Sequence, residues 1–468
     1  MIVALVVACA FFMETFTGTV ITTALPAMAV SFGSDAVELS VGVTAYLLAL
    51  AVFIPASGWA ADRYGARTVF RAAIGVFTLA SVGCGLSNSL FELVAMRVVQ
   101  GIGGAMMVPV GRLVVLRSIE KSEYPKAMAY LTVPAFIGPV LGPPVGGFIT
   151  TFFSWRWVFF LNVPIGLVGI VLASILIENV RDPKTPPLDW RGFLLSGVSL
   201  ASVLYSLDLA AHGTLQGGIG FIGLLAFGLV LGAAAFFHSH RHPHPLIGVS
   251  LFRIPTFAIA TLGGTFFRTG AGSIPYLLPV FLQLGLGMTA FAAGLLVFAD
   301  AFGNMAMNGF SPLVLRRWGF RKVLLCNGTI NLVGMASITL FTATTPAVVI
   351  ALVLFCAGLS RSMQYNALSN LQYADVETRQ MSAASSFASM LQQLCSGAGI
   401  ATGAIILQLA LILRGAAPDA LAAGDIRYAL LAVALITFGG LAFYRRLDAQ
   451  AGAEVSGHRG KLAVASDD

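Results

Sequence analysis

Four ionisable residues inside long apolar stretches are the positions at which this sequence could do chemistry: Glu14, Arg97, Arg268 and Asp300. A carboxyl group alone in a region of low dielectric constant favours its neutral, protonated form, and a neighbouring arginine favours the charged form. A carboxyl that gains and loses an arginine neighbour would therefore bind and release a proton. We expect Glu14 and Asp300 to couple to protons or to contact a bound molecule; the alternative is a permanent structural ion pair.

The composition places these residues in a membrane. Of 468 residues, 57% are hydrophobic and 10% are charged, against about 25% charged in a soluble domain. The mean hydropathy is +0.88, so the chain lacks the polar shell of a soluble protein, and disorder requires the opposite composition. The 27 Lys and Arg outnumber the 20 Asp and Glu, but they stand in short groups between apolar runs, unlike a nucleic-acid-binding surface. We expect an all-α polytopic membrane protein with no nucleic-acid partner.

Fourteen apolar runs are long enough to cross a bilayer core of about 30 Å as helices. The first run contains Glu14 and lacks a charged segment before it, so we expect a mature helix and not a signal peptide. The runs cover residues 2–25, 41–61, 70–86, 90–116, 127–152, 158–177, 193–211, 219–237, 257–284, 289–315, 323–341, 347–366, 382–413 and 428–444.

The basic residues predict the orientation of the chain. If the N-terminus is cytoplasmic, 20 of the 27 Lys and Arg lie in cytoplasmic loops or the C-terminal tail, and three lie in the opposite loops. The other four lie inside apolar runs: Arg97, Arg112, Arg268 and Arg361. The positive-inside rule therefore puts both termini in the cytoplasm, which requires an even number of helices. Fourteen is favoured over twelve because the seventh and eighth runs are almost continuously apolar.

Depth along the runs predicts two pairs among the intramembrane charges. At about 1.5 Å per residue, Asp300 and Arg268 each lie about 17 Å into their runs, so we expect them to pair. Glu14 and Arg97 lie about 16 and 10 Å from the outer face, within reach of a long side chain. Because Glu14 has the more distant arginine, we expect it to carry the proton and Asp300 to form a fixed pair.

Two motifs combine glycine with charge or proline. The gating motif follows the second run and consists of Gly58, Asp62, Arg63, Gly65 and Arg67; part of it recurs at Gly319 and Arg321. This repetition suggests two related bundles, although basic turns also follow from charge topology alone. The helix 5 motif, in the fifth run, consists of Gly138, Pro139, Gly142, Pro143, Gly146 and Gly147. Its glycines permit close helix packing, and its prolines favour a bend.

These motifs resemble those of the major facilitator superfamily. The gating motif is similar to the signature between the second and third helices of that family, and the helix 5 motif to the stretch that marks its antiporters. Arg97-Val-Val-Gln100-Gly101-Ile-Gly103-Gly104 is similar to a fourth-helix stretch. Met13-Glu14 and Ala24-Leu25-Pro26 resemble the opening of the fourteen-helix drug:proton antiporter branch. This chain departs from the branch at Thr17, where Asp is usual, and at Ala66, where Arg or Lys is usual.

The resemblance implies fourteen transmembrane helices, arranged as two six-helix bundles plus two inserted helices. The corresponding segments are 1–180 for the N-terminal bundle, 181–256 for the linking pair, 257–447 for the C-terminal bundle and 448–468 for a cytoplasmic tail. The gating motif would then be an ionic latch between the bundles when the inner gate is closed. The helix 5 motif would be a hinge and outer seal, and the alternative is a tight structural crossing alone.

The resemblance also implies a secondary active transporter of the bacterial inner membrane. Such a protein would exchange protons for amphipathic drugs or toxic compounds by alternating access, as a monomer, with no cofactor beyond the coupling proton. An exporter dedicated to one metabolite is a second interpretation. A membrane enzyme or a sensor is disfavoured, because no HExxH, GxSxG or GxxxxGK[ST] motif and no sizeable soluble segment is present.

Histidines and cysteines are the remaining candidates for metal binding. His238, His240, His242 and His244 alternate after the eighth run, between prolines that favour an extended chain. We expect a cytoplasmic linker there in preference to a metal site. The five cysteines show no CxxC spacing, so we expect small buried hydrophobes and no metal.

Overall fold

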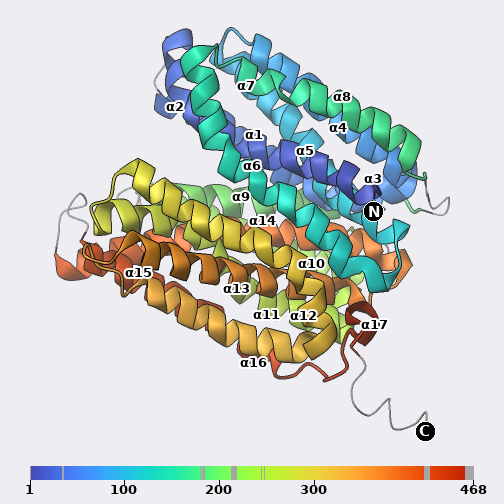
Figure 1. Ribbon diagram of the computed structural model, residues 1–468. Coiled ribbons are helices and arrows are strands. Elements are labelled where there is room, and N and C mark those ends of the chain that lie inside the picture. Colours follow the sequence, from blue (N-terminus) through green and yellow to red (C-terminus); the bar gives the residue numbers. More distant parts are fainter. Residues whose placement is uncertain are drawn as a thin grey trace.

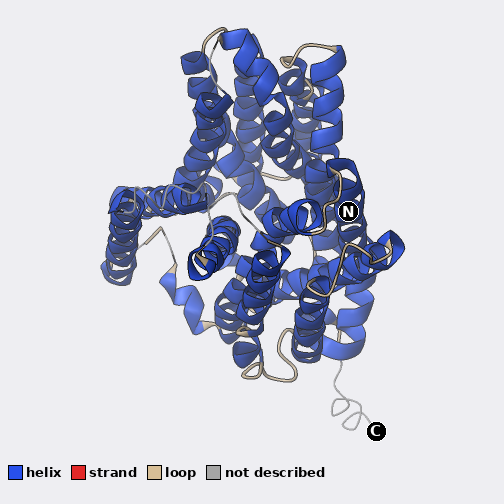
Figure 2. Ribbon diagram, turned by 90° about the vertical axis from the view of Figure 1, so that its left-hand side faces the viewer, coloured by secondary structure: helices blue, strands red, loops and turns tan. Residues whose placement is uncertain are grey.

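The computed structural model describes residues 2–33, 36–179, 181, 185–211, 219–243, 245–246, 248–415 and 422–458. Across these ranges the chain forms helices and loops and no β-strand (Figure 2). A helix satisfies its backbone N–H and C=O groups within one segment, which is why an apolar chain of this composition folds into helices. The expected all-α, multi-pass class is confirmed.

The α-helices from α1 to α16 follow the apolar runs, and a few of them are short. They are α1 (Ile2–Phe32), α2 (Ala36–Phe53), α3 (Ser57–Tyr64), α4 (Ala66–Leu86), α5 (Leu90–Ser118), α6 (Tyr124–Phe152), α7 (Trp157–Phe160), α8 (Asn162–Leu176), α9 (Trp190–Ala211), α10 (Ile219–Arg241), α11 (Pro255–Val280), α12 (Ala290–Ile338), α13 (Ala347–Ala374), α14 (Met381–Arg414), α15 (Ala423–Phe438) and α16 (Leu441–Tyr444). The remaining short elements of the described ranges are η1 (Ile54–Ala56), η2 (Lys121–Glu123), η4 (Val249–Arg253), η5 (Phe281–Gly285), η6 (Thr378–Gln380) and α17 (Ala453–Ser456). Within the described ranges, ten segments are long and apolar enough to cross a membrane.

Gly65 and Gly319, the glycines of the repeated motif, each end a helix several residues beyond the end of the corresponding apolar run. Helix α3 continues the second run past its expected end and carries the charges of the gating motif, until Gly65 adopts a φ of 91°. Helix α12 contains a kink at Gly319, where φ is 70° and ψ is 166°, so it consists of two helices. Glycine tolerates positive φ without the steric cost that a Cβ imposes, and this makes it the residue at both turns.

The helices form two groups, stacked one above the other in Figure 1. In the first group α1 packs on α6 and α4 packs on α5 and α8; in the second, α11 packs on α14 and α12 packs on α13. We call these groups the N-terminal half and the C-terminal half. Helices α9 and α10 pack on each other, and α9 also contacts α2 and α14, one helix from each half.

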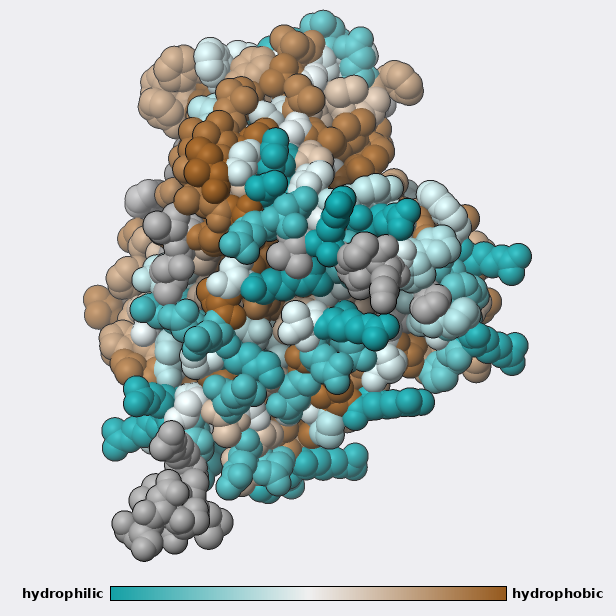
Figure 3. Space-filling model, turned by 90° about the vertical axis from the view of Figure 1, so that its right-hand side faces the viewer, coloured by the Kyte–Doolittle hydropathy of each residue, from teal (hydrophilic) through white to brown (hydrophobic). Residues whose placement is uncertain are grey.

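One end of the molecule collects the polar connections, and we call it the basic end. It includes α3, α17 and the loop before α14, and both N and C labels lie toward it (Figure 1). Seen from this side, hydrophilic residues gather over the surface below an apolar upper part (Figure 3). The distribution is typical of a helical bundle whose polar loops face water.

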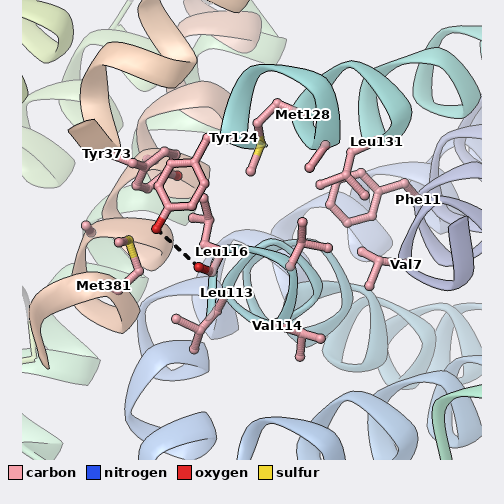
Figure 4. Close-up of a cluster of buried hydrophobic side chains, with 14 of the residues drawn as sticks. Val7, Phe11, Leu113, Val114, Leu116, Tyr124, Met128, Leu131, Tyr373 and Met381 are labelled. Carbon is pink, nitrogen blue, oxygen red and sulfur yellow. Dashed lines mark hydrogen bonds between the residues drawn. The ribbon is translucent and has the colours of Figure 1, made fainter. Parts of the chain in front are cut away.

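The apolar core shows where the two halves meet. Toward the basic end, one cluster of buried side chains contains residues of both halves, such as Leu116 and Tyr124 beside Tyr373 and Met381 (Figure 4). Toward the opposite end, the halves have separate clusters: one around Trp155 in the N-terminal half and one around Phe281 in the C-terminal half. The described core therefore joins the halves at the basic end only.

Candidate functional site

The gating motif lies at the contact between the halves. Asp62 on α3 forms an ion pair with Arg117 of α5, with 2.8 Å between Oδ1 and Nη2. Its other carboxylate oxygen accepts a hydrogen bond from the Ser382 hydroxyl, at the start of α14 in the C-terminal half. Asp62 thus links an arginine of its own half to a hydroxyl of the other.

Close backbone packing accompanies this link. A Cβ on Gly58 would lie 2.7 Å from the Ser382 carbonyl oxygen, so only glycine permits the approach of α3 to α14. Two hydrogen bonds join α14 to the N-terminal half here, one to α3 and one to α5. The Ser57 and Ser386 hydroxyl oxygens are 2.8 Å apart, and the Ser385 hydroxyl donates to the Pro109 carbonyl at 2.7 Å. Close packing and hydrogen bonds therefore hold the two halves together at the basic end.

The two arginines of the motif have backbone partners. Arg63 donates to the Thr185 carbonyl at 3.3 Å, and Arg67 donates to the Ile177 carbonyl at 3.4 Å. Both acceptors lie in the segment that leads from α8 to α9. The arginine that pairs with Asp62 is therefore Arg117, which is outside the motif.

The helix 5 motif forms the contact between α6 and α1. A Cβ on Gly138 would lie 2.8 Å from the Phe16 backbone nitrogen, and one on Gly142 would lie 3.0 Å from the Thr19 Cβ. Gly146 is buried, whereas a Cβ on Gly147 would meet nothing within 4 Å. Helix α6 is continuous through the prolines; the side chains of Pro139 and Pro143 lie outside the described set. The close-packed face thus includes Gly138 and Gly142 and leaves out Gly147.

Glu14 occupies the interior of the N-terminal half. Its Oε2 atom is buried and has no hydrogen-bond partner in the described part of the chain. Arg112 of α5 is close enough for its charge to interact with that of Glu14, and Tyr46 of α2 is also in electrostatic range. Arg112 donates a hydrogen bond of 3.2 Å to the Tyr373 hydroxyl, across the interface.

The expected pair of Glu14 with Arg97 is wrong. Arg97 is completely buried, and its Nε donates to the Gly42 carbonyl at 3.1 Å while its Nη1 donates to Gln100 at 2.7 Å. Its guanidinium carbon lies 4.3 Å from the centre of the Tyr46 ring. These contacts hold the guanidinium between α2 and α5, so the Arg97 side chain does not extend toward Glu14 on α1.

The expected pair of Asp300 with Arg268 is also wrong. Asp300 on α12 forms its ion pair with Arg361 of α13. Helices α12 and α13 approach closely at Gly358, where a Cβ would lie 3.0 Å from the Asn304 nitrogen, and this crossing brings Asp300 to Arg361. Arg268 on α11 instead donates to Gln372 at 3.0 Å, and its Nε and Nη1 are buried without a partner in the described residues.

A cluster at the interface brings together residues that the sequence analysis did not assign to a site. Tyr365 of α13 lies in electrostatic range of Arg112 from one half and Arg268 from the other. With Tyr373 and Glu14, these residues form what we call the central cluster. The sequence contained a signal for this cluster: Arg112 is a charged residue inside an apolar run, and of two tyrosines eight residues apart, Tyr365 lies at the end of another run and Tyr373 lies beyond it.

A second feature that the sequence analysis missed is a buried amide network in the C-terminal half. Asn366 donates to Asn308 at 2.8 Å, and Asn327 donates to Gln364 at 3.0 Å. Repeated Asn and Gln side chains on the runs around 304 and 366 could have indicated it. Amides that bridge helices in this way give polar helix–helix contacts inside a membrane.

The first part of the histidine segment, as far as Arg241, is helical and not extended as expected. His238 and His240 belong to the last turn of α10, and the His242 nitrogen continues the helix by donating to the His238 carbonyl at 2.9 Å. The prolines that were expected to extend the segment lie beyond this turn; His244 is outside the described residues. His238, His242 and Asp189 form a group whose candidate ligand atoms lie within 4.8 Å of one another.

Comparison with known proteins agrees with this architecture. The family model described as Major Facilitator Superfamily matches residues 7–400. A protein of Shigella sonnei (strain Ss046) named multidrug resistance protein MdtD is 37% identical over 408 residues, which cover 86% of this chain and 85% of that protein. Its namesake in Escherichia coli (strain SMS-3-5 / SECEC) is 36% identical over the same length and coverage.

Solved structures show the same fold. The proton:xylose symporter XylE, bound to 6-bromo-6-deoxy-D-glucose, superimposes with a TM-score of 0.66 at 14% identity and covers 97% of this chain and 98% of its own. The human organic anion transporter MFSD10 gives a TM-score of 0.67 at 13% identity, over 94% and 98% of the two chains. By its sequence match and its fold, this chain belongs to the major facilitator superfamily, a family of membrane transporters and not of enzymes.

Proposed function

We propose that this transporter exports amphipathic drugs or toxic compounds in exchange for protons, by alternating access. Two relatives that match most of the chain are named for multidrug resistance. The observation that carries the proton part is the unpartnered Oε2 of Glu14 beside an arginine that is bonded to the other half.

The central cluster offers a route from domain motion to proton affinity. With the basic end closed, Tyr373 holds Arg112 across the interface. When the halves separate there, that bond breaks, and Arg112 becomes available to Glu14, where its charge favours the carboxylate and loss of the proton. Closing reverses the change. Protonation and gate position are thereby linked, as exchange transport requires.

We propose that the basic end and both termini are cytoplasmic in the bacterial inner membrane. The excess of Lys and Arg in the loops on that side supports this orientation. The joined core at the basic end then corresponds to a closed inner gate and an outward-facing state. Glu14 would load its proton from outside in this state and release it inside in the other.

We further propose fourteen spans in one self-sufficient chain. Ten described segments are long and apolar enough to span the membrane, and four more long apolar helices bring the number to fourteen: α6, α11 and the two parts of α12. Bundles at 1–180 and 257–447, with a linking pair at 181–256, agree with the packing of α9 on α10. Asp300 with Arg361 then acts as a fixed pair within one bundle.

Transport into everted membrane vesicles tests the proposal. A proton gradient, acid inside, should drive uptake of a fluorescent amphipathic cation such as ethidium, and a protonophore should stop it. Glu14→Gln should abolish gradient-driven uptake at equal amounts of protein. Uptake that is indifferent to the protonophore would remove proton coupling, and a failure to move any of a panel of amphipathic dyes would favour an exporter dedicated to one metabolite.

A further inference from the structure

A group of three side chains of the types that ligate metals lies away from the central cluster, where α10 ends and α9 begins. His238 lies in the last turn of α10 and His242 directly follows the helix, where its N–H donates to the His238 carbonyl; their ring centroids are 5.1 Å apart, and Asp189 immediately precedes α9. Their candidate ligand atoms all lie within 4.8 Å of one another. Two histidines at positions i and i+4 present their nitrogens on one helix face, which is a spacing that suits zinc.

The Asp189 carboxylate is held in place and incompletely used. Its Oδ1 accepts hydrogen bonds from the Gly192 backbone N–H at 2.9 Å and from His238 Nε2 at 2.8 Å. Its Oδ2 is buried without a hydrogen-bond partner in the described residues, and the residue as a whole is only 7% exposed. A buried carboxylate oxygen with no partner, on a side chain that already contacts an imidazole through its other oxygen, indicates a missing positive ligand.

The charge state suits a cation. Asp189 is an acidic residue, and the hydrogen bond from the Gly192 backbone N–H to its carboxylate favours the ionised form. Two arginines lie near these residues in sequence, Arg191 after Asp189 and Arg241 before His242. Both are exposed to solvent, which screens their positive charges from a bound cation.

We propose that Asp189, His238 and His242 bind Zn²⁺ and fasten the end of α10 to the start of α9. Two imidazoles and one carboxylate match the nitrogen and oxygen ligands of Zn²⁺, and water would fill the fourth position. Tetrahedral bonds of about 2.1 Å place ligand atoms about 3.4 Å apart. Asp189 Oδ1 and His238 Nε2, now 2.8 Å apart, would therefore separate by about 0.6 Å, and ligand atoms that are farther apart than 3.4 Å would approach one another. Half-buried histidines at a helix end can make these movements by small changes of rotamer.

The position of the site gives it a mechanical connection to the gate. The segment before Asp189 carries the Pro186 carbonyl, which accepts a hydrogen bond of 2.9 Å from Trp59 Nε1, and the Thr185 carbonyl, which accepts from Arg63. Both donors belong to α3, the helix of the gating motif. A metal at this site would fix the end of the linking pair that touches α3.

Metal titration of the purified full-length protein tests the proposal. The untagged protein, treated with a chelator and then titrated with ZnCl₂ by calorimetry, should bind one Zn²⁺ per chain. Asp189→Asn, His238→Gln and His242→Gln should each lower the affinity at least about tenfold. His240→Gln is the matched control, because it changes the histidine between the two ligands and should leave the affinity unchanged.

Thermal melting gives a second readout: the melting temperature of each protein with ZnCl₂ is compared with that of the same protein without it. His238→Gln also removes the hydrogen bond to Asp189, whereas His242→Gln leaves that bond intact. The wild-type protein and His240→Gln should be stabilised by Zn²⁺, and His242→Gln should not. Zn²⁺ stabilisation of His242→Gln equal to that of the wild-type protein would overturn the proposal. So would calorimetry in which the wild-type protein binds no Zn²⁺, or binds it with an affinity that the three ligand substitutions do not lower.

Discussion

Replacing Gly58 by alanine should open the gate at the basic end. The new Cβ would lie 2.7 Å from the Ser382 carbonyl oxygen and 2.7 Å from the Ser386 hydroxyl oxygen. Ordinary contact begins at 3.4 Å, so the overlap with each is about 0.7 Å. The hydroxyl can rotate away, but the carbonyl belongs to the α14 backbone, and so α3 and α14 must separate.

The size of the effect follows from the cost of overpacking. An extra methyl group in a close-packed contact costs about 1–3 kcal/mol. This cost is present only when the gate is closed, so it shifts the closed-to-open equilibrium about 5- to 150-fold toward the open form. Separation also weakens the hydrogen bonds from Ser382 to Asp62 and between Ser57 and Ser386.

Pulsed electron spin resonance can measure this shift. Spin labels at Ser122 and Glu377, which are exposed at the basic end on the two halves, report the separation in a background without the five native cysteines. Gly58→Ala should add a population at longer distance. Gly147→Ala is the matched control, because its Cβ meets nothing within 4 Å. An unchanged distance distribution in Gly58→Ala, with wild-type transport, would refute the packing argument.

Three further outcomes are expected. Gly142→Leu should abolish transport while the protein still purifies as a single species, because leucine cannot fit against Thr19; measured transport at the wild-type rate would argue against a close-packed contact of α6 with α1. Arg361→Met should destabilise the protein by about 3–5 kcal/mol by leaving Asp300 buried without its partner, and Asp300→Asn combined with it should restore part of the loss; thermal melting of both variants checks this, and an unchanged melting temperature in Arg361→Met would contradict it. A reporter fused after Asp468 should behave as cytoplasmic and one inserted near Gly287 as external, and an external C-terminus would overturn the even helix count.

The fold could be predicted because its signals are strong and local. Long apolar runs bounded by charge determine the helices, and the described helices begin and end near them. The exceptions at Gly65 and Gly319 have a local cause: each helix continues to a glycine that adopts positive φ, beyond the last apolar residue. The sequence analysis ended each helix where hydropathy fell. At the membrane edge, however, a helix can continue through a polar turn, because polar side chains are solvated by water there.

The partners of the buried charges could not be predicted in the same way. Depth along a helix fixes one coordinate, whereas each residue turns the side chain by about 100° around the axis. Arg268 and Asp300 share a depth but face different neighbours, and the approach at Gly358 selects Arg361. Similarly, Arg97 is held by Gly42 and Gln100, and Arg112 approaches Glu14. These choices depend on which helices pack together, and that information is absent from any single run.

The most direct test of the account compares Glu14→Gln with Asp300→Asn in reconstituted vesicles. Two quantities are followed for each protein: the protons released when drug is added, and drug exchange without any gradient. We predict that Glu14→Gln still exchanges drug but no longer releases protons, because it retains the apolar contacts of the site and loses the titrating group, whereas folded Asp300→Asn keeps both activities. Proton release that persists in Glu14→Gln and is lost in a folded, drug-exchanging Asp300→Asn would contradict the assignment of Glu14 as the proton carrier.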